Sequence, residues 1–287
     1  MQEQLICHYT KREVAMEKIL VTKQLRLGQI GQTNDPRESK PWEIPIPFTS
    51  GLQGKEREKE EELVKETISE IRRVMKEEWK VLCFTSEKQP LNSEKWPLNL
   101  EINCLLEGIE EYYFNHCYTH PRMWAQYAEN HTGVCLIFDK NKLDQSINDE
   151  LGQRCKLYQG LVQYDKIHSG EVITPLPRTL IEDIGKFGTT NSARKYLLDW
   201  YKFFFLRKHP DWETEVEYRW PAHSEKSAPE FVSITNSILM VLVGVDFPQN
   251  SESDLINLCK DLQIPAKRFV WKNGMPVLDH FIKIYEP

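Results

Sequence analysis

Three short, mostly apolar runs most strongly limit how this chain can fold. They are KVLCFT at residues 80–85, VCLIF at residues 134–138 and ILMVLVGV at residues 238–245. Runs of this length predict buried strands, and the segments between them carry helical periodicity. The chain lacks the clean βαβ alternation with a Gly-rich turn that a doubly wound nucleotide-binding fold requires. We therefore expect an α+β fold with a mixed, bent or split β-sheet and flanking helices.

The 287 residues fit one elaborated α+β domain over residues 1–287. Residues 5–10 (LICHYT) predict a strand, and the following KREVAMEKIL predicts a helix. Residues 55–79 are dominated by charge, yet apolar residues recur there at spacings of four, three and four, at Val64, Ile68, Ile71 and Met75. This pattern predicts a charged amphipathic helical insertion at the periphery of the domain. Residues 98–113 and most of residues 178–208 are also predicted to be helical, whereas the Pro- and Ser-rich residues up to Gly54 predict a loop.

Charge and cysteine usage limit the partners and the compartment. The net charge of −6 provides no global positive field, so a nucleic-acid partner is not favoured. The seven cysteines are scattered singly without a C-x-x-C pair, which favours reduced thiols over a disulfide framework or a zinc site. No apolar run is long enough for a membrane span, and the first residues lack a signal-peptide pattern. We expect a soluble, cytoplasmic protein without a membrane partner or a bound metal.

Residues 212–220, WETEVEYRW, alternate charged and uncharged side chains. In a strand, Glu213, Glu215, Glu217 and Arg219 would line one face. Three carboxylates on one face repel each other, and Arg219 can directly neutralise only one neighbour. If this face is partly buried, at least one carboxylate needs a raised pKa or a cationic group nearby. Glu215 and Glu217 are the functional candidates, with Arg219 as charge partner; a solvated face for all four is the alternative.

Three other segments carry candidate site residues. His8 ends a β-type run beside the hydroxyl of Thr10, so it can present a donor into a cleft or can simply bind a local carbonyl. The hydroxyls in CFTS at residues 83–86 follow a predicted strand and either line a pocket or form a turn. In RMWAQYAE, Trp124 and Tyr127 lie three residues apart on a predicted helix, a spacing that is more typical of core packing than of a ligand platform.

Several short motifs follow one another along the chain: HYT at residues 8–10, NDP at 34–36, CFT at 83–85, MWAQYA at 123–128, GVCLIFD at 133–139 and WETEVEYR at 212–219. In this order the motifs resemble an uncharacterised bacterial and phage family that carries a domain-of-unknown-function label. They match the family pattern HYT, NDP, CFS, MWxxYA, GxCxxFD and WxxExExR. The resemblance covers most of the chain and brings no established activity.

The first strand, helix and strand also resemble, more distantly, the start of ADP-ribosyltransferase domains. In that superfamily a strand-borne His contacts the ribose of NAD, a later aromatic residue stacks on nicotinamide, and a Glu on a late strand holds the ribose hydroxyl. The resemblance implies an NAD-binding set of His8, Tyr9, Thr10 and Tyr127, with Trp124 as a rival to Tyr127. It implies a catalytic set of Glu215 or Glu217 with Arg219. Tyr9 stands where many of those enzymes have Gly.

The resemblance implies an NAD-dependent ADP-ribosyltransferase or NAD glycohydrolase, in phage defence or stress response. NAD would be the substrate, and the acceptor a macromolecule or water. A carboxylate near the ribose would stabilise the positive charge that builds up as the nicotinamide bond breaks. The alternative is a non-catalytic nucleotide-sensing or protein-interaction module, for which the charged helix at residues 55–79 would be a partner surface. A third possibility, a Mg²⁺ nuclease, would need Asp35, Asp139 and Glu215 to converge.

Overall fold

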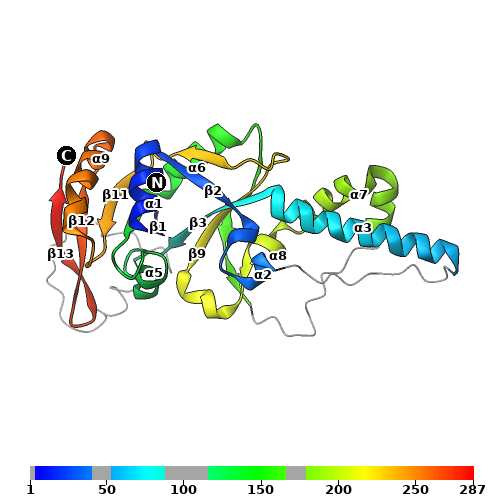
Figure 1. Cartoon of the computed structure of the whole chain (residues 1–287), viewed down its shortest axis with the longest axis horizontal. Helices are drawn as coiled ribbons and strands as arrows, with labels where there is room; N and C mark the ends of the chain where they lie inside the picture. Colours follow the sequence, from blue (N-terminus) through cyan, green and yellow to red (C-terminus); the bar gives the residue numbers. More distant parts are fainter. Residues whose placement is uncertain (1–3, 41–52, 88–115, 166–178) are drawn as a thin grey trace.

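The computed structural model describes residues 4–40, 53–87, 116–165 and 179–287 (Figure 1). The helix predicted at residues 98–113 and most of the loop predicted before Gly54 lie outside these ranges. Within them, the chain forms an α+β fold in which helices flank one large mixed β-sheet. This coarse fold class agrees with the prediction from the apolar runs.

Most of the strands join one sheet in the order β10-β2-β3-β1-β4-β11-β12-β13, and β9 pairs with β3 outside this path. The strands of this path are β10 (Glu230–Ser233), β2 (Gln24–Gln29), β3 (Trp79–Ser86), β1 (Leu5–Thr10), β4 (Val134–Asp139), β11 (Ile238–Val243), β12 (Ala266–Lys272) and β13 (Met275–Tyr285). Strand β9 (Glu217–His223) also pairs with the short strands β5 (Lys156–Leu157) and β6 (Gly160–Leu161). A second, two-stranded sheet joins β7 (Gln163–Tyr164) to β8 (Arg207–Lys208). Because β11 and β12 are parallel while β4 is antiparallel to both β1 and β11, the large sheet is mixed.

The sheet splits along one edge of β3. Near its start, Val81 and Lys80 pair with Gly28 and Gln29 of β2, whereas near its end Thr85 and Ser86 pair with β1. On the other edge, β9 pairs with β3 along almost its whole length. A strand has only two edges for pairing, so β1 and β2 must share one of them. The residues of β3 between these two pairings face the gap where β1 and β2 diverge.

Helices cover both faces of the sheet. The helical elements are α1 (Arg12–Val14), η1 (Ala15–Leu20), η2 (Ile30–Gln32), α2 (Pro36–Ser39), α3 (Lys55–Glu77), α5 (Pro121–Gln126), α6 (Lys140–Leu151), α7 (Thr179–Asp199), α8 (Tyr201–Phe205), η3 (Pro210–Glu215), η4 (Gln249–Ser251) and α9 (Glu252–Leu262). Successive strand residues point to opposite faces, so Ile6 of β1 packs into the core beneath η1, α6 and α9. Its neighbour Cys7 packs on the other face with Trp124 of α5 and Phe269.

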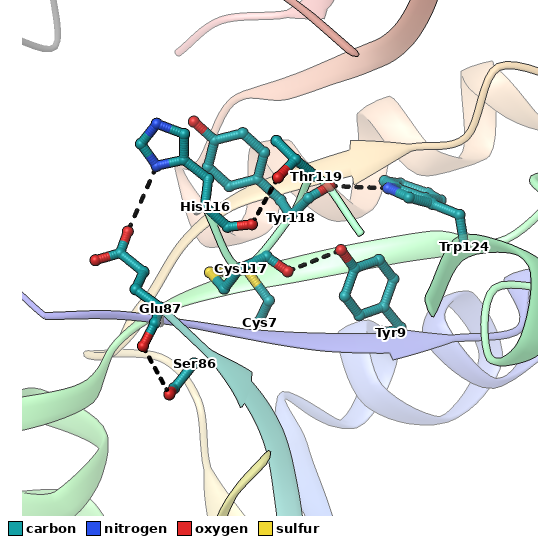
Figure 2. Close-up of a disulfide and its surroundings, with 9 residues drawn as sticks. All are labelled: Cys7, Tyr9, Ser86, Glu87, His116, Cys117, Tyr118, Thr119 and Trp124. Atoms are coloured by element: carbon teal, nitrogen blue, oxygen red, sulfur yellow. Dashed lines mark hydrogen bonds and ion pairs between the residues drawn. A yellow bond between two sulfur atoms is a disulfide. The ribbon is translucent and has the colours of Figure 1, made fainter. Parts of the chain in front are cut away.

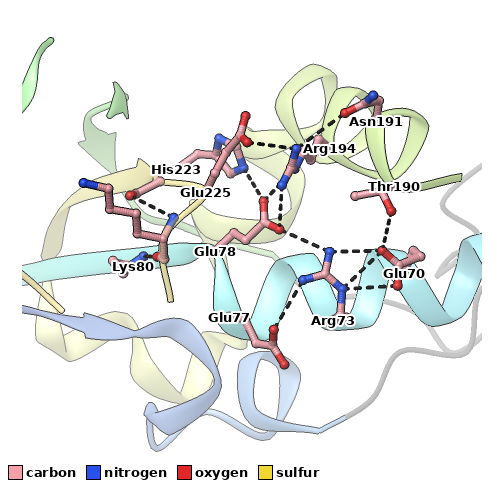
Figure 3. Close-up of polar contacts among 12 residues, drawn as sticks. Glu70, Arg73, Glu77, Glu78, Lys80, Thr190, Asn191, Arg194, His223 and Glu225 are labelled. Carbon is pink, nitrogen blue, oxygen red and sulfur yellow. Dashed lines mark hydrogen bonds and ion pairs between the residues drawn. The ribbon is translucent and has the colours of Figure 1, made fainter. Parts of the chain in front are cut away.

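Helices α3 and α7 lie side by side and extend away from the sheet (Figure 1). The apolar face of α3 packs with α7, α8 and Trp79, whose indole stacks on Phe205 with ring centroids 4.0 Å apart. At the junction with the sheet, the buried Glu78 accepts hydrogen bonds from Arg194 at 2.8 and 3.1 Å and lies 3.1 Å from His223 Nε2 (Figure 3). This polar cluster fixes the two helices to β9.

The predicted strand at residues 212–220 is only partly correct. Its first half is the 3-10 helix η3, and β9 begins at Glu217. Pro210 starts the helical turn, and Val216 adopts a left-handed conformation with φ of 46°, which reverses the chain direction before β9. The alternation therefore holds within β9. Tyr218 and Trp220 pack into the core on one face of the sheet, whereas Glu217 and Arg219 point to the other face. Glu213 is exposed. Glu215, Glu217 and Arg219 are buried, so the alternative of a solvated face for all four residues is wrong.

The glycine of the GVCLIFD motif is required by a close backbone approach. A Cβ at Gly133 would lie 2.5 Å from the carbonyl oxygen of Thr10 and 2.8 Å from that of Ala128. Both neighbours are main-chain atoms, which cannot rotate away. Gly133 therefore lets the turn after α5 pack against the end of β1.

We predict that Gly133→Ala lowers the free energy of unfolding by about 1–3 kcal/mol, because the added methyl group overpacks a rigid site. Chemical denaturation monitored by circular dichroism measures this loss. The matched control is Gly185→Ala in α7, where an added Cβ meets nothing within 4 Å. Gly185→Ala should leave the free energy of unfolding unchanged or raise it by up to about 1 kcal/mol. Equal stabilities of Gly133→Ala and the wild type would contradict the packing argument.

Candidate functional site

A pocket of about 250 Å³ lies where the sheet splits. Its walls come from β1, from the segment that follows β2, from the divergent part of β3, from the α5 region and from residues around η3 and β9. The lining residues are Cys7, His8, Tyr9, Gln32, Thr33, Asn34, Cys83, Phe84, Thr85, Met123, Tyr127, Lys208, Glu215, Glu217 and Arg219. Segments that lie far apart in the sequence therefore converge on one cleft.

His8 bridges the gap between β1 and β3. Its Nδ1 lies 3.1 Å from the carbonyl oxygen of Cys83, and its ring tilts against Phe84. A carbonyl oxygen can only accept, so this contact assigns the proton to Nδ1 and leaves Nε2 as an acceptor. Burial lowers the pKa of His8, and the bond to Cys83 offsets only part of that shift. The imidazole is therefore held neutral at pH 7, in a fixed tautomer.

Arg219 lies at the centre of a buried ion-pair network. Its guanidinium has no exposed surface and donates to both oxygens of Glu217, with Nε to Oε1 at 2.6 Å and a terminal nitrogen to Oε2 at 3.1 Å. Another nitrogen of Arg219 pairs with Glu38 of α2 and donates to the carbonyl oxygen of Phe205 at 3.0 Å. This pairing fixes α2 and the pocket segment before it to β9.

Lys208 connects the two candidate glutamates. Its Nζ lies 2.7 Å from Glu215 Oε2 and 2.8 Å from Glu217 Oε2. On the other side, the hydroxyl of Tyr127 donates to Glu215 Oε1 at 2.6 Å. Glu215 ends η3 and Glu217 begins β9, so the left-handed Val216 between them lets both carboxylates reach Lys208.

Burial and the charges in this network shift the pKa of four of the groups described above. Burial raises the pKa of Glu217, but the charges of Arg219 and Lys208 outweigh burial and lower it to about 2. Burial lowers the pKa of Lys208, yet the carboxylates, Glu217 first, hold it above its ordinary value. Burial and then the charge of Glu215 raise the pKa of Tyr127, which keeps its hydroxyl a donor. Burial raises the pKa of Glu38 in spite of Arg219.

The two glutamates differ in their remaining hydrogen-bonding capacity. A carboxylate has about four acceptor positions. Glu217 uses three of them for Arg219 and Lys208. Glu215 accepts one donor at each oxygen, from Tyr127 and Lys208, and keeps about two positions for a ligand. Glu215 is therefore better suited than Glu217 to bind a ligand in the pocket.

The structure brings together six of the eight residues predicted for the site. His8, Tyr9, Tyr127, Glu215, Glu217 and Arg219 line the pocket, whereas Thr10 and Trp124 do not. The indole of Trp124 is fully buried, stacks on Phe269 and donates to the carbonyl oxygen of Tyr118 at 2.8 Å. Trp124 is thus a core residue, as the helical spacing indicated, whereas Tyr127 lines the pocket.

Asp35, Asp139 and Glu215, the three carboxylates of the nuclease hypothesis, do not share this pocket, because only Glu215 lines it. Asp139 instead caps α6 by accepting from the backbone of Asn141 and Lys142. In the described ranges, no group of three or more His, Cys, Asp or Glu side chains could hold a metal ion.

Sequence reasoning missed Lys208 and Glu38 as parts of the site. Lys208 follows an aromatic helix, and nothing in the sequence around it indicates that its side chain is buried. Glu38 lies in the short helix α2, 181 residues before Arg219, and no local pattern signals that such a glutamate is buried. A general rule could have found Lys208, because buried carboxylates require cations from elsewhere in the chain.

One cysteine expectation is wrong. Cys7 and Cys117 form a disulfide that joins β1 to the segment before α5 (Figure 2). The same junction is fixed by Tyr9, whose hydroxyl donates to the carbonyl oxygen of Cys117 at 2.8 Å. Cys83, Cys135, Cys155 and Cys259 are free thiols. Spacing along the sequence could not reveal a bridge over 110 residues.

Comparison with known protein families shows a similarity to an uncharacterised family over part of the chain. The model of a protein family of unknown function, DUF2971, matches residues 123–220, which include Tyr127, Lys208 and Glu215 but not His8. This confirms the resemblance inferred from the motifs. No curated protein and no solved structure matches the chain. The ADP-ribosyltransferase-like fold therefore stays a prediction.

In the part of the chain that the structure describes, no helix has the length and apolar character needed to cross a membrane.

We predict that the unfolding free energy falls as the pH is lowered from about 4.5 to 2, the range between the ordinary and the folded pKa of Glu217. Because the pKa of Glu217 is lower in the folded than in the unfolded protein, the ionised carboxylate stabilises the fold at pH values above its unfolded pKa. Protonation of Glu217 at lower pH removes this contribution, which is on the order of 3 kcal/mol. The pKa values of Glu70 and Glu78 are also lowered, so these residues add to the pH dependence. Comparing the wild type with Glu217→Gln isolates the contribution of Glu217.

Denaturant titrations at several pH values measure this dependence. Glu217→Gln should flatten it, whereas Glu213→Gln, at an exposed position four residues before, should keep the wild-type dependence. A pH dependence that is the same in all three proteins would contradict the assigned role of Glu217.

Proposed function

We propose that this protein binds the nicotinamide riboside half of NAD in the split-sheet pocket and cleaves the bond between nicotinamide and ribose. ADP-ribose would pass to a macromolecule or to water. The single observation that carries the proposal is that His8, Tyr127 and Glu215, which lie far apart in the sequence, line one pocket. These are a neutral histidine, an aromatic ring and a carboxylate with free acceptor positions.

The charge balance of the pocket supports this chemistry. Glu38, Glu215 and Glu217 contribute three carboxylates, whereas Lys208 and Arg219 contribute two cations. When all five groups are ionised, one negative charge is left over beside the pocket. Such a site favours a ligand that is cationic or becomes cationic, and nicotinamide in NAD carries a positive charge.

The reaction would break the bond between ribose C1′ and the nicotinamide nitrogen. The electron pair leaves with nicotinamide, which becomes neutral, and positive charge develops on the ribose. Glu215 would stabilise this charge more strongly in the transition state than in the ground state. The acceptor then bonds to C1′ and loses its proton.

The two other residues have roles that match their contacts. The ring of Tyr127 offers a π face to the cationic nicotinamide, while its hydroxyl holds Glu215 Oε1 in place. His8 is fixed by Cys83, so its Nε2 can accept a hydrogen bond from a ribose hydroxyl. The pocket volume of about 250 Å³ fits half of a dinucleotide better than the whole molecule.

A nucleotide-sensing module is the second candidate function. It is favoured by the contacts of Glu215, whose charge Lys208 already neutralises at 2.7 Å. A neutralised carboxylate stabilises a developing cation less strongly, which suits binding without bond cleavage. In this function the same pocket would recognise NAD and report its presence.

We predict that Glu215→Gln lowers kcat/KM for release of nicotinamide from NAD by about 10²–10³, because the variant loses the negative charge beside the ribose. Chromatographic measurement of nicotinamide gives the rate. Glu213→Gln is the matched control, since Glu213 lies in the same turn with an exposed side chain. The control should retain the wild-type rate.

Binding separates the two candidates. The probe is an NAD analogue in which a methylene group replaces the ring oxygen of the nicotinamide ribose, so that it is not cleaved. Binding of this analogue together with nicotinamide release from NAD supports the enzyme. Binding without release supports the sensor and contradicts the enzyme, and absence of binding contradicts both.

A further inference from the structure

One polar atom of the pocket wall has no hydrogen-bond partner among the residues that the structure describes. Thr85, near the end of β3, lines the pocket and is 1% exposed. Its Oγ1 is buried and has no hydrogen-bond partner among the described residues. A hydroxyl removed from water without a hydrogen bond destabilises the folded protein, so such groups are rare and call for an explanation.

The neighbours of Thr85 explain why the hydroxyl stays unpaired. Thr85 pairs with Glu217 of β9 on one side and with Cys7 of β1 on the other. Residues directly opposite in a sheet point to the same face, so Thr85 lies beside the carboxylate of Glu217. The oxygens of Glu217 are already engaged by Arg219 and Lys208. The carboxylate beside Thr85 is therefore committed to other donors.

We propose that Thr85 is a ligand-binding residue, whose hydroxyl exchanges a hydrogen bond with a neutral hydroxyl or amide group of the ligand. A hydroxyl both donates and accepts, so it can serve either group. Phosphate is disfavoured at this place, because Glu217 beside it and Glu215 are carboxylates. In naming NAD as the ligand, the assignment rests on the proposed function. The group bound is then a ribose hydroxyl or the carboxamide of nicotinamide.

The test is Thr85→Val, which replaces the hydroxyl by a methyl group of similar size. The affinity for the uncleavable NAD analogue, measured by calorimetry, should fall about tenfold, the loss expected for one hydrogen bond. The unliganded variant should gain stability, with Tm raised by about 2 °C, because an unpaired buried hydroxyl has been removed. Loss of binding with gain of stability is not expected from a residue with a purely structural role.

Two control variants separate the hydroxyl from other effects of substitution. Thr85→Ser keeps the hydroxyl and should retain the affinity to within about threefold. Ser192→Ala removes another buried hydroxyl that has no partner among the described residues and does not line the pocket. Ser192→Ala should leave the affinity at the wild-type value.

Nicotinamide and ADP-ribose identify the group that Thr85 binds. If Thr85→Val weakens nicotinamide binding, the group is the carboxamide; if it weakens only ADP-ribose binding, the group is a ribose hydroxyl. Equal affinities of Thr85→Val and the wild type for the NAD analogue, nicotinamide and ADP-ribose would overturn the role of Thr85 in ligand binding but not the proposed function. A lower Tm of unliganded Thr85→Val would also overturn it, since the hydroxyl would then have a partner within the protein. Wild-type protein that binds none of the probes would overturn both this assignment and the proposed function.

Discussion

The buried guanidinium of Arg219 is the interaction on which the rest of the site depends. It connects Glu217 of β9 to Glu38 of α2, and through Glu217 it is coupled to Lys208 and Glu215. Removing one partner of such a network leaves an uncompensated buried charge, which typically costs about 3–5 kcal/mol. The network therefore fixes the pocket segment before α2, the turn η3 and the start of β9 relative to one another.

The split in the sheet provides the space that this network surrounds. Because β1 and β2 share one edge of β3 and then diverge, the middle of β3 is open to a side chain instead of a strand. His8 occupies part of this gap and binds the carbonyl oxygen of Cys83, which the diverging strands leave available. The pocket thus combines apolar side chains, such as Phe84 and Met123, with a charged wall formed by Lys208, Glu215, Glu217 and Arg219. A low-dielectric surrounding strengthens the electrostatic effect of that wall on a ligand.

The sequence predicted the strands with mostly apolar runs and the site residues on them. Residues 80–85 and 134–138 lie within β3 and β4. The alternation around Glu217 and Arg219 correctly predicts that both side chains lie on the same face of β9. The alternation failed before Glu217, because the pattern does not reveal the left-handed Val216 that ends η3. The pairing of Glu38 with Arg219 and the Cys7–Cys117 bridge could not be predicted, since each depends on contacts over more than a hundred residues. Short-range periodicity reports which face a residue takes and carries no information about its distant partner.

The central claim is that the split-sheet pocket binds the nicotinamide riboside half of NAD between His8, Tyr127 and Glu215. A crystal structure of the protein with the uncleavable NAD analogue tests it most directly. We expect the nicotinamide ring against Tyr127 and the adjoining ribose within hydrogen-bonding distance of Glu215 and His8 Nε2. An analogue bound at another surface while this pocket holds only solvent would contradict the account.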